Sequence, residues 1–74
     1  DIASKLDVYE IFRQMARQGS AIVFVSSDEE ELVSMGRNTD HYSVAVMYDG
    51  KIVKRLYGSD ITTANIISAS IPTG

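Results

Sequence analysis

The sequence contains no cysteine, so disulfide bonds cannot stabilise its 74 residues. Chains below about 70–80 residues usually depend on disulfides, a metal ion or a partner, because a core of that size stabilises them only weakly. The lack of cysteine also fits a reducing compartment such as the cytoplasm. With 45% hydrophobic and 23% charged residues, the composition is typical of a globular chain and not of a disordered one.

Basic clusters and long apolar runs are missing as well. The seven cations are scattered along a chain of net charge −3, whereas a nucleic-acid-binding surface gathers lysine and arginine on one face. We therefore expect no nucleic-acid partner. No apolar run approaches the roughly 20 residues that cross a bilayer. The start at Asp1 has neither an initiator methionine nor a signal-peptide pattern, so we interpret the sequence as a fragment cut from inside a longer chain.

The spacing of apolar residues in the first half predicts a helix, a strand and a second helix. The first helix carries one apolar stripe and ends at Gly19; the stripe consists of Val8, Ile11, Phe12, Met15 and Ala16. Residues 21–25 form a short run rich in β-branched residues, which predicts a strand buried on both faces. Ser27 followed by Glu30 matches a capping box and predicts Ser27 as the N-cap of a helix that ends near Gly36.

The second half predicts a β-hairpin and a last helix. Residues 44–48 and 51–56 flank Asp49-Gly50, a strong two-residue turn signal. Residues 62–69 form the last helix, with a threonine at its start. The predicted fold class is therefore α/β, in the order α-β-α-β-β-α, as a single partial domain over residues 1–74.

Few residues suggest chemistry on their own. The acidic run of residues 28–31 is best interpreted as the first turn of a helix, where carboxylates complement the positive end of the helix dipole. A metal site there is disfavoured, because adjacent helical residues point in different directions. His41, the only histidine, lies in a polar connector between Asp40 and Tyr42, and we interpret it as a surface or turn residue. Neither a phosphate-binding glycine loop nor a zinc-binding HExxH motif is present.

Three stretches together resemble the end of an ATP-binding cassette of ABC transporters. "DIASKLDVYEIFRQMARQGSAIVFVSSDEEEL" is similar to the run from the D-loop aspartate, through a helix, to a strand that ends in Ser-Ser-acid. "VAVMYDGKIV" and "DITTANIISASIPTG" are similar to the hairpin and the C-terminal helix that follow. More narrowly, the chain resembles the C-terminal part of the second cassette in sugar-importer subunits of the ribose, galactose and xylose type. The fold implied is part of a P-loop NTPase core.

The resemblance implies roles for three residues near the nucleotide. Ser27 stands at the switch-histidine position close to the γ-phosphate, Asp28 lies beside it, and Asp1 matches the D-loop aspartate. The connector at Asp40 is longer than is usual in the family, so the role of Asp40 is left open, as is that of His41. The loops that hold ATP and Mg²⁺ would lie upstream of Asp1, so the fragment alone is expected to be non-catalytic and to bind no cofactor.

The resemblance also implies a cellular setting. The parent subunit would hydrolyse ATP to drive sugar import, on the cytoplasmic face of the membrane, bound to a permease and to a paired cassette. In that fold another strand separates residues 21–25 from residues 44–48. Without it we expect these two strands to pair directly, or their exposed edges to associate with another copy. The alternative is a stand-alone interaction module that docks through its acidic helix start.

Overall fold

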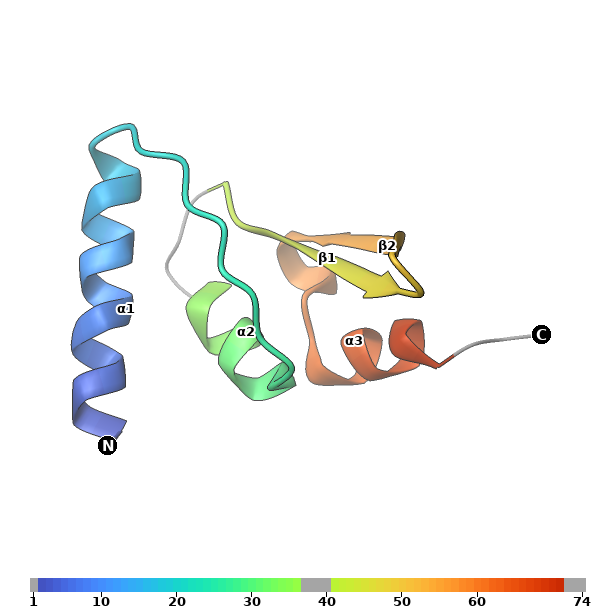
Figure 1. Cartoon of the computed structure of the whole chain (residues 1–74). Helices are drawn as coiled ribbons and strands as arrows, with labels where there is room; N and C mark the ends of the chain where they lie inside the picture. Colours follow the sequence, from blue (N-terminus) through green and yellow to red (C-terminus); the bar gives the residue numbers. More distant parts are fainter. Residues whose placement is uncertain (1, 37–40, 72–74) are drawn as a thin grey trace.

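The structure is a computed structural model that describes residues 2–36 and 41–71. Three helices and a two-stranded antiparallel sheet make up the described chain (Figure 1). In order they are α1 (Ile2–Arg17), α2 (Glu29–Gly36), β1 (Ser43–Tyr48), β2 (Lys51–Tyr57), the short 3₁₀ helix η1 (Gly58–Asp60) and α3 (Thr63–Ser70). The α/β prediction is thus confirmed, but the expected order loses its first strand.

The segment predicted as that strand, residues 21–25, is extended but pairs with none of the described residues. Its side chains alternate: Phe24 is half-buried, whereas Val23 and Val25 are 90% and 89% exposed. β-Branched residues favour extended backbone, but a strand also needs a neighbouring edge to bond with. Direct pairing with residues 44–48 is therefore wrong for this structure, because the one described strand that pairs with β1 is β2. Association with another copy stays a prediction.

The hairpin forms as predicted, because its turn residues adopt the backbone that a tight hairpin requires. Asp49 and Gly50 have positive φ angles of 53° and 74°, as in the type I′ turn that suits twisted strands. The register pairs Tyr48 with Lys51 and Ser43 with Tyr57, with an irregularity between Val46 and Met47. The predicted helix stop is confirmed too, since Gly19 follows α1 with a φ of 99°.

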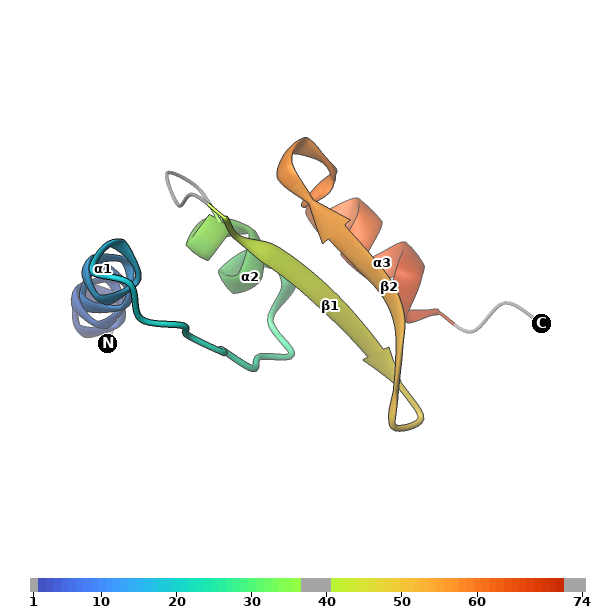
Figure 2. The same ribbon diagram turned by 90° about the horizontal axis from the view of Figure 1, so that it is seen from above.

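The core lies where the hairpin covers α2 and α3 (Figure 2). Alternate residues of β1 and one residue each of β2 and α3 are buried there: Val44, Val46, Leu56 and Ile66. α3 begins where the sequence predicts, because the Thr62 side chain accepts a hydrogen bond from the Asn65 N–H at 3.1 Å. The small core thus joins the second half of the chain to α2.

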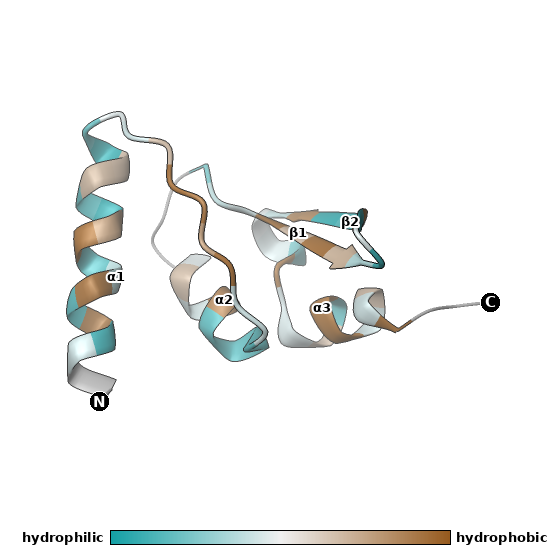
Figure 3. Cartoon of the chain, viewed as in Figure 1, coloured by the Kyte–Doolittle hydropathy of each residue, from teal (hydrophilic) through white to brown (hydrophobic). Residues whose placement is uncertain are grey.

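α1 lies apart from the hairpin and contacts the segment before α2 and α2 itself (Figures 1 and 2). Its buried residue is Tyr9, 7% exposed, whereas Val8, Ile11 and Met15 of the predicted stripe are 44%, 52% and 43% exposed. Figure 3 shows hydrophobic colour along both α1 and the following extended segment. The stripe predicts the helix correctly, and its Phe12 packs near Phe24. The residue buried most deeply is nevertheless Tyr9, which lies outside the stripe and bonds Glu31 of α2.

Candidate functional site

Two residues that the resemblance places near the nucleotide, Ser27 and Asp28, lie in the turn at residues 26–28, where the extended segment enters α2. The Ser26 Oγ accepts a hydrogen bond from the Asp28 N–H at 3.0 Å. The Asp28 Oδ1 in turn accepts from the N–H groups of Glu30 at 3.1 Å and Glu31 at 3.3 Å. Asp28 is therefore the N-cap of α2, which corrects the prediction of Ser27. Both residue types cap well, and the aspartate adds a negative charge at the positive end of the helix.

Contrary to the sequence prediction, Ser27 therefore does not cap α2. It is exposed at the turn, and within residues 2–36 and 41–71 no hydrogen bond uses its hydroxyl. Because Asp28 caps α2, the helix does not use the Ser27 hydroxyl. Among the three residues of the turn, Ser27 is the one whose side chain is available to an outside ligand.

Glu31, in the first turn of α2, joins the turn to α1. Its Oε1 accepts a hydrogen bond from the Ser26 hydroxyl at 2.7 Å, and its Oε2 accepts one from the Tyr9 hydroxyl. The Lys5 Nζ lies 3.9 Å from the same Oε2. The hydrogen bonds from Tyr9 and then Ser26, followed by the charge of Lys5, hold the pKa of the Glu31 carboxyl below its ordinary value. The hydrogen bond to Glu31 raises the pKa of Tyr9 to about 12.

Aromatic packing supports this polar contact. The ring of Phe24 meets that of Tyr9 edge to face, with centroids 6.0 Å apart at 84°, and lies 6.2 Å from that of Phe12. Arg13 also reaches across from α1 and donates to the Ser34 carbonyl at 3.2 Å. α1 therefore packs against the extended segment before the turn and forms hydrogen bonds with α2 after it.

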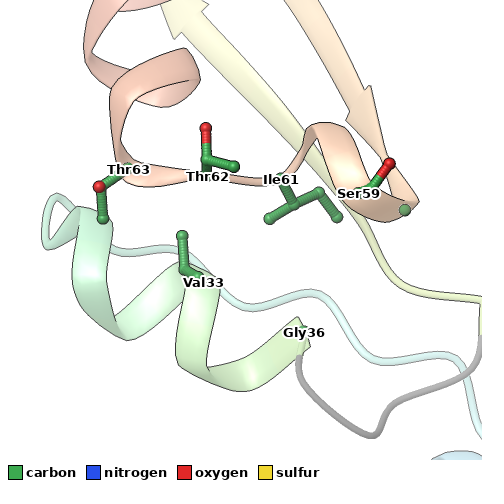
Figure 4. A pocket seen from close by; sticks show the side chains of 7 residues that line it. Val33, Gly36, Ser59, Ile61, Thr62 and Thr63 are labelled. Carbon is green, nitrogen blue, oxygen red and sulfur yellow. The ribbon is translucent and has the colours of Figure 1, made fainter.

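A shallow pocket of about 510 Å³ lies elsewhere, between the end of α2 and the start of α3 (Figure 4). Val33 and Ile61 point toward each other across it, whereas the Thr62 side chain points away and caps α3. None of the described residues that line it is charged; they are Val33, Gly36, Gly58, Ser59, Ile61, Thr62 and Thr63. None of the residues that the resemblance places near the nucleotide lines this pocket, so the turn remains the candidate site.

Other chemical candidates are absent from the described ranges or lie outside them. In residues 2–36 and 41–71 no three acidic, histidine or cysteine side chains gather in a way that could hold a metal ion. None of the described helices has the length and apolar character needed to cross a membrane. Asp1 and Asp40 lie outside the described residues. His41 is exposed, with a positive φ of 60°.

Comparison with known proteins gives a consistent set of relatives. The chain is 38% identical over 74 residues to the ribose import ATP-binding protein RbsA 1 of Rhizobium etli, which is 100% of the chain and 14% of that protein. It is 40% identical over 68 residues to RbsA of Yersinia pestis, and 38% identical over 68 residues to RbsA 2 of Escherichia coli O157:H7. In both cases 92% of the chain aligns with 12% of the relative.

The chain is homologous to a short segment of RbsA. It spans only about an eighth of the length of these relatives, between 12% and 14%. No protein-family model matches it, and neither does any solved structure. The predicted resemblance is thereby confirmed as homology to a segment of a ribose import ATP-binding protein.

The contact that sequence reasoning missed is the one between Tyr9 and Glu31. The acidic run predicts Glu31 as part of a first helical turn and nothing more, and Tyr9 lies outside the predicted apolar stripe. The two residues are 22 positions apart, on different helices. No periodicity within one element relates them, so only the packing of α1 on α2 could reveal the pair.

Proposed function

We propose that the chain is the C-terminal part of the second cassette of a sugar-importer ATP-binding subunit. The subunit would hydrolyse ATP to drive uptake of a monosaccharide-like solute such as ribose. The observation that carries this proposal is the similarity to a ribose import ATP-binding protein along all 74 residues of the chain, at 38% identity. The aligned segment includes the whole turn at residues 26–28 and the hairpin after it.

Within that subunit Ser27 is the residue that we place beside the γ-phosphate. Its exposure and unused hydroxyl support the assignment, because a hydroxyl can donate a hydrogen bond to a phosphate oxygen. Asp28 would act beside it by holding the turn, since its carboxylate is committed to the N–H groups of α2. A serine carries no positive charge, so Ser27 would orient the phosphate and not neutralise it.

ATP and Mg²⁺ would be bound mainly by parts of the subunit other than this chain. The described residues offer no cluster of three carboxylate, histidine or cysteine ligands, so they do not fit a Mg²⁺ site. Asp1 would face the paired cassette, as the resemblance implies. The subunit would work at the inner face of the cell membrane, bound to a permease.

The direct test is replacement of the homologous segment in a relative. We would exchange it in RbsA 2 of Escherichia coli O157:H7 for this chain, then measure ATP hydrolysis and ribose uptake. We expect the chimera to hydrolyse ATP within about tenfold of the parent, a barrier difference of ~1.4 kcal/mol. Ser27→Ala in the chimera should lower kcat further, whereas Glu30→Gln, on an exposed side chain in the same helical turn, should not.

The alternative of a stand-alone acidic interaction module predicts the opposite result. A chimera that is folded by circular dichroism and assembles with its permease, but hydrolyses no ATP, would reject the proposed function. A Ser27→Ala chimera that is as active as the unmutated chimera would reject the role proposed for Ser27.

A further inference from the structure

Glu31 divides its two carboxylate oxygens between two parts of the molecule. Oε1 binds the Ser26 hydroxyl at 2.7 Å, on the turn, and Oε2 binds the Tyr9 hydroxyl, on α1. The carboxylate is planar and rigid, so neither oxygen can move without the other. The side chain is only 16% exposed, and Tyr9 is buried, so water competes little for either bond.

Ser26 connects Glu31 to the rest of the turn through two hydrogen bonds. A hydroxyl has one proton to donate, and Ser26 gives it to Glu31 while its oxygen accepts the Asp28 N–H at 3.0 Å. The direction of the Ser26 hydroxyl is thus fixed from both sides. Because Ser27 lies between these two bonded residues, the backbone that presents its hydroxyl is fixed as well.

From this geometry we infer that Glu31 is a positioning residue that couples the place of α1 to the orientation of the turn at residues 26–28. Glu31 does not touch a ligand; it acts through Ser26. The inference rests on the proposed function for its meaning, since the turn then presents Ser27 to the nucleotide and α1 follows directly after Asp1, the residue placed at the paired cassette. Movement at that interface would reach Ser27 through Tyr9, Glu31 and Ser26.

The coupling itself can be tested on the full chain without nucleotide. Tyr9→Phe removes the hydroxyl but keeps the ring, and so keeps the contact with Phe24. We expect it to shift the amide NMR signals of the turn at residues 26–28, although no hydrogen bond joins Tyr9 to the turn directly. In a Glu31→Ala background the same substitution should leave those signals where they are. Tyr42→Phe is the matched control, because it removes a hydroxyl that bonds the Leu32 carbonyl on α2 at 2.7 Å.

A purely structural role for Glu31 predicts a different pattern. Tyr9→Phe would then shift signals around its own ring only, or shift the turn equally with and without Glu31, and either result overturns the coupling. Should Glu31→Ala leave the chain unfolded, the reciprocal variant Ser26→Ala decides the matter. Coupling between two sites is reciprocal, so Ser26→Ala must shift the ring signals of Tyr9. Unmoved Tyr9 signals would overturn the inference.

The catalytic consequence is tested in the RbsA chimera. Glutamine replaces one acceptor oxygen by an NH₂ donor, so Glu31→Gln loses the arrangement in which one oxygen accepts from Ser26 and the other accepts from Tyr9. We expect it to lower kcat several-fold with KM for ATP nearly unchanged, whereas Glu30→Gln should alter neither. An equal loss in both variants would overturn the positioning role. If the unmutated chimera is inactive while the amide NMR coupling is present, the proposed function fails and the coupling stands. If the chimera is active and the coupling is absent, the proposed function stands and the role of Glu31 fails.

Discussion

The Tyr9 hydroxyl donates a hydrogen bond to the Glu31 carboxylate, and this contact joins α1 to α2 across 22 positions of the sequence. Both partners are titratable, and each stabilises one protonation state of the other. Tyr9 must keep its proton to donate, and Glu31 accepts from Tyr9 and Ser26 most strongly when its carboxylate is ionised. The contact is therefore stable over a bounded range of pH, with one limit set by each residue.

The acidic limit is set by Glu31. Its pKa in the folded chain is lowered by the bonds from Tyr9 and Ser26 and by Lys5. Its contribution is fully present above the ordinary glutamate value of about 4.3 and is lost as the pH falls through the lowered folded value. We expect the difference in free energy of unfolding between the natural chain and Glu31→Gln to shrink over that range. Urea denaturation at a series of pH values measures it.

Glu30→Gln provides the control for the acidic limit. Its side chain is exposed, so its effect on the free energy of unfolding should be small at every pH. If the Glu31→Gln difference is the same at neutral and at acid pH, the carboxylate form of Glu31 is not what stabilises the contact.

The alkaline limit is set by Tyr9. The hydrogen bond to Glu31 raises the pKa of Tyr9 to about 12, above the ordinary tyrosine value of about 10. A raised pKa gives a contribution that is fully present below the ordinary value and lost as the pH rises through the folded value. In an absorbance titration of tyrosinate, we expect Tyr9→Phe to remove a step near pH 12. Burial also raises the pKa of Tyr42, so Tyr42→Phe must be titrated beside it; a step near pH 12 that is kept in Tyr9→Phe and lost in Tyr42→Phe contradicts the assignment.

How far the sequence predicts this structure depends on how local each signal is. The turn at Asp49-Gly50 and the cap at Thr62 depend on a few adjacent residues, and both form as predicted. The strand at residues 21–25 does not form, because pairing depends on a neighbouring strand that the pattern of one segment cannot supply. The β-branched residues do give an extended backbone there, but no described strand lies beside it to pair with.

The candidate site shows the same division. The sequence placed a serine and an acid at a helix start, and the structure has them there. The capping-box pattern predicts Ser27 as the N-cap, but the helix starts one residue later and Asp28 caps it. The pattern is misleading here because serine and aspartate cap almost equally well. The bond that fixes the turn comes from Glu31 and depends on α1, which no local motif encodes.

The assignment of the N-cap gives a stability prediction. Asp28→Ala removes the acceptor for two N–H groups of α2 and should lower the free energy of unfolding by about 1 kcal/mol. Ser27→Ala should change it by less than about 0.5 kcal/mol, because its exposed hydroxyl caps nothing. Urea denaturation of the two variants at neutral pH compares them directly. The opposite ranking would restore Ser27 as the cap.

Association of copies is a further prediction, carried by the extended segment. Val23 and Val25 lie 90% and 89% exposed on a backbone that pairs with none of the described residues, an arrangement that favours edge-to-edge contact. We expect the chain to show a mass above that of a monomer by light scattering at high concentration. The double variant Val23→Ser and Val25→Ser should lower that mass. A natural chain that stays monomeric at every concentration rules this association out.

The same double variant separates the isolated chain from the proposed subunit. In the chain alone the two valines bury almost no surface, so serine there should change the free energy of unfolding by less than about 0.5 kcal/mol per site. Val44→Ser, at a position 5% exposed, is the positive control and should cost about 1–3 kcal/mol. In the RbsA chimera we expect the valines to pack within a strand of the completed sheet, so the double variant should lose thermal stability and ATP hydrolysis. If the chimera tolerates both serines as well as the chain does, residues 21–25 are not a buried strand of a cassette, and the proposed place of this chain within the subunit is wrong.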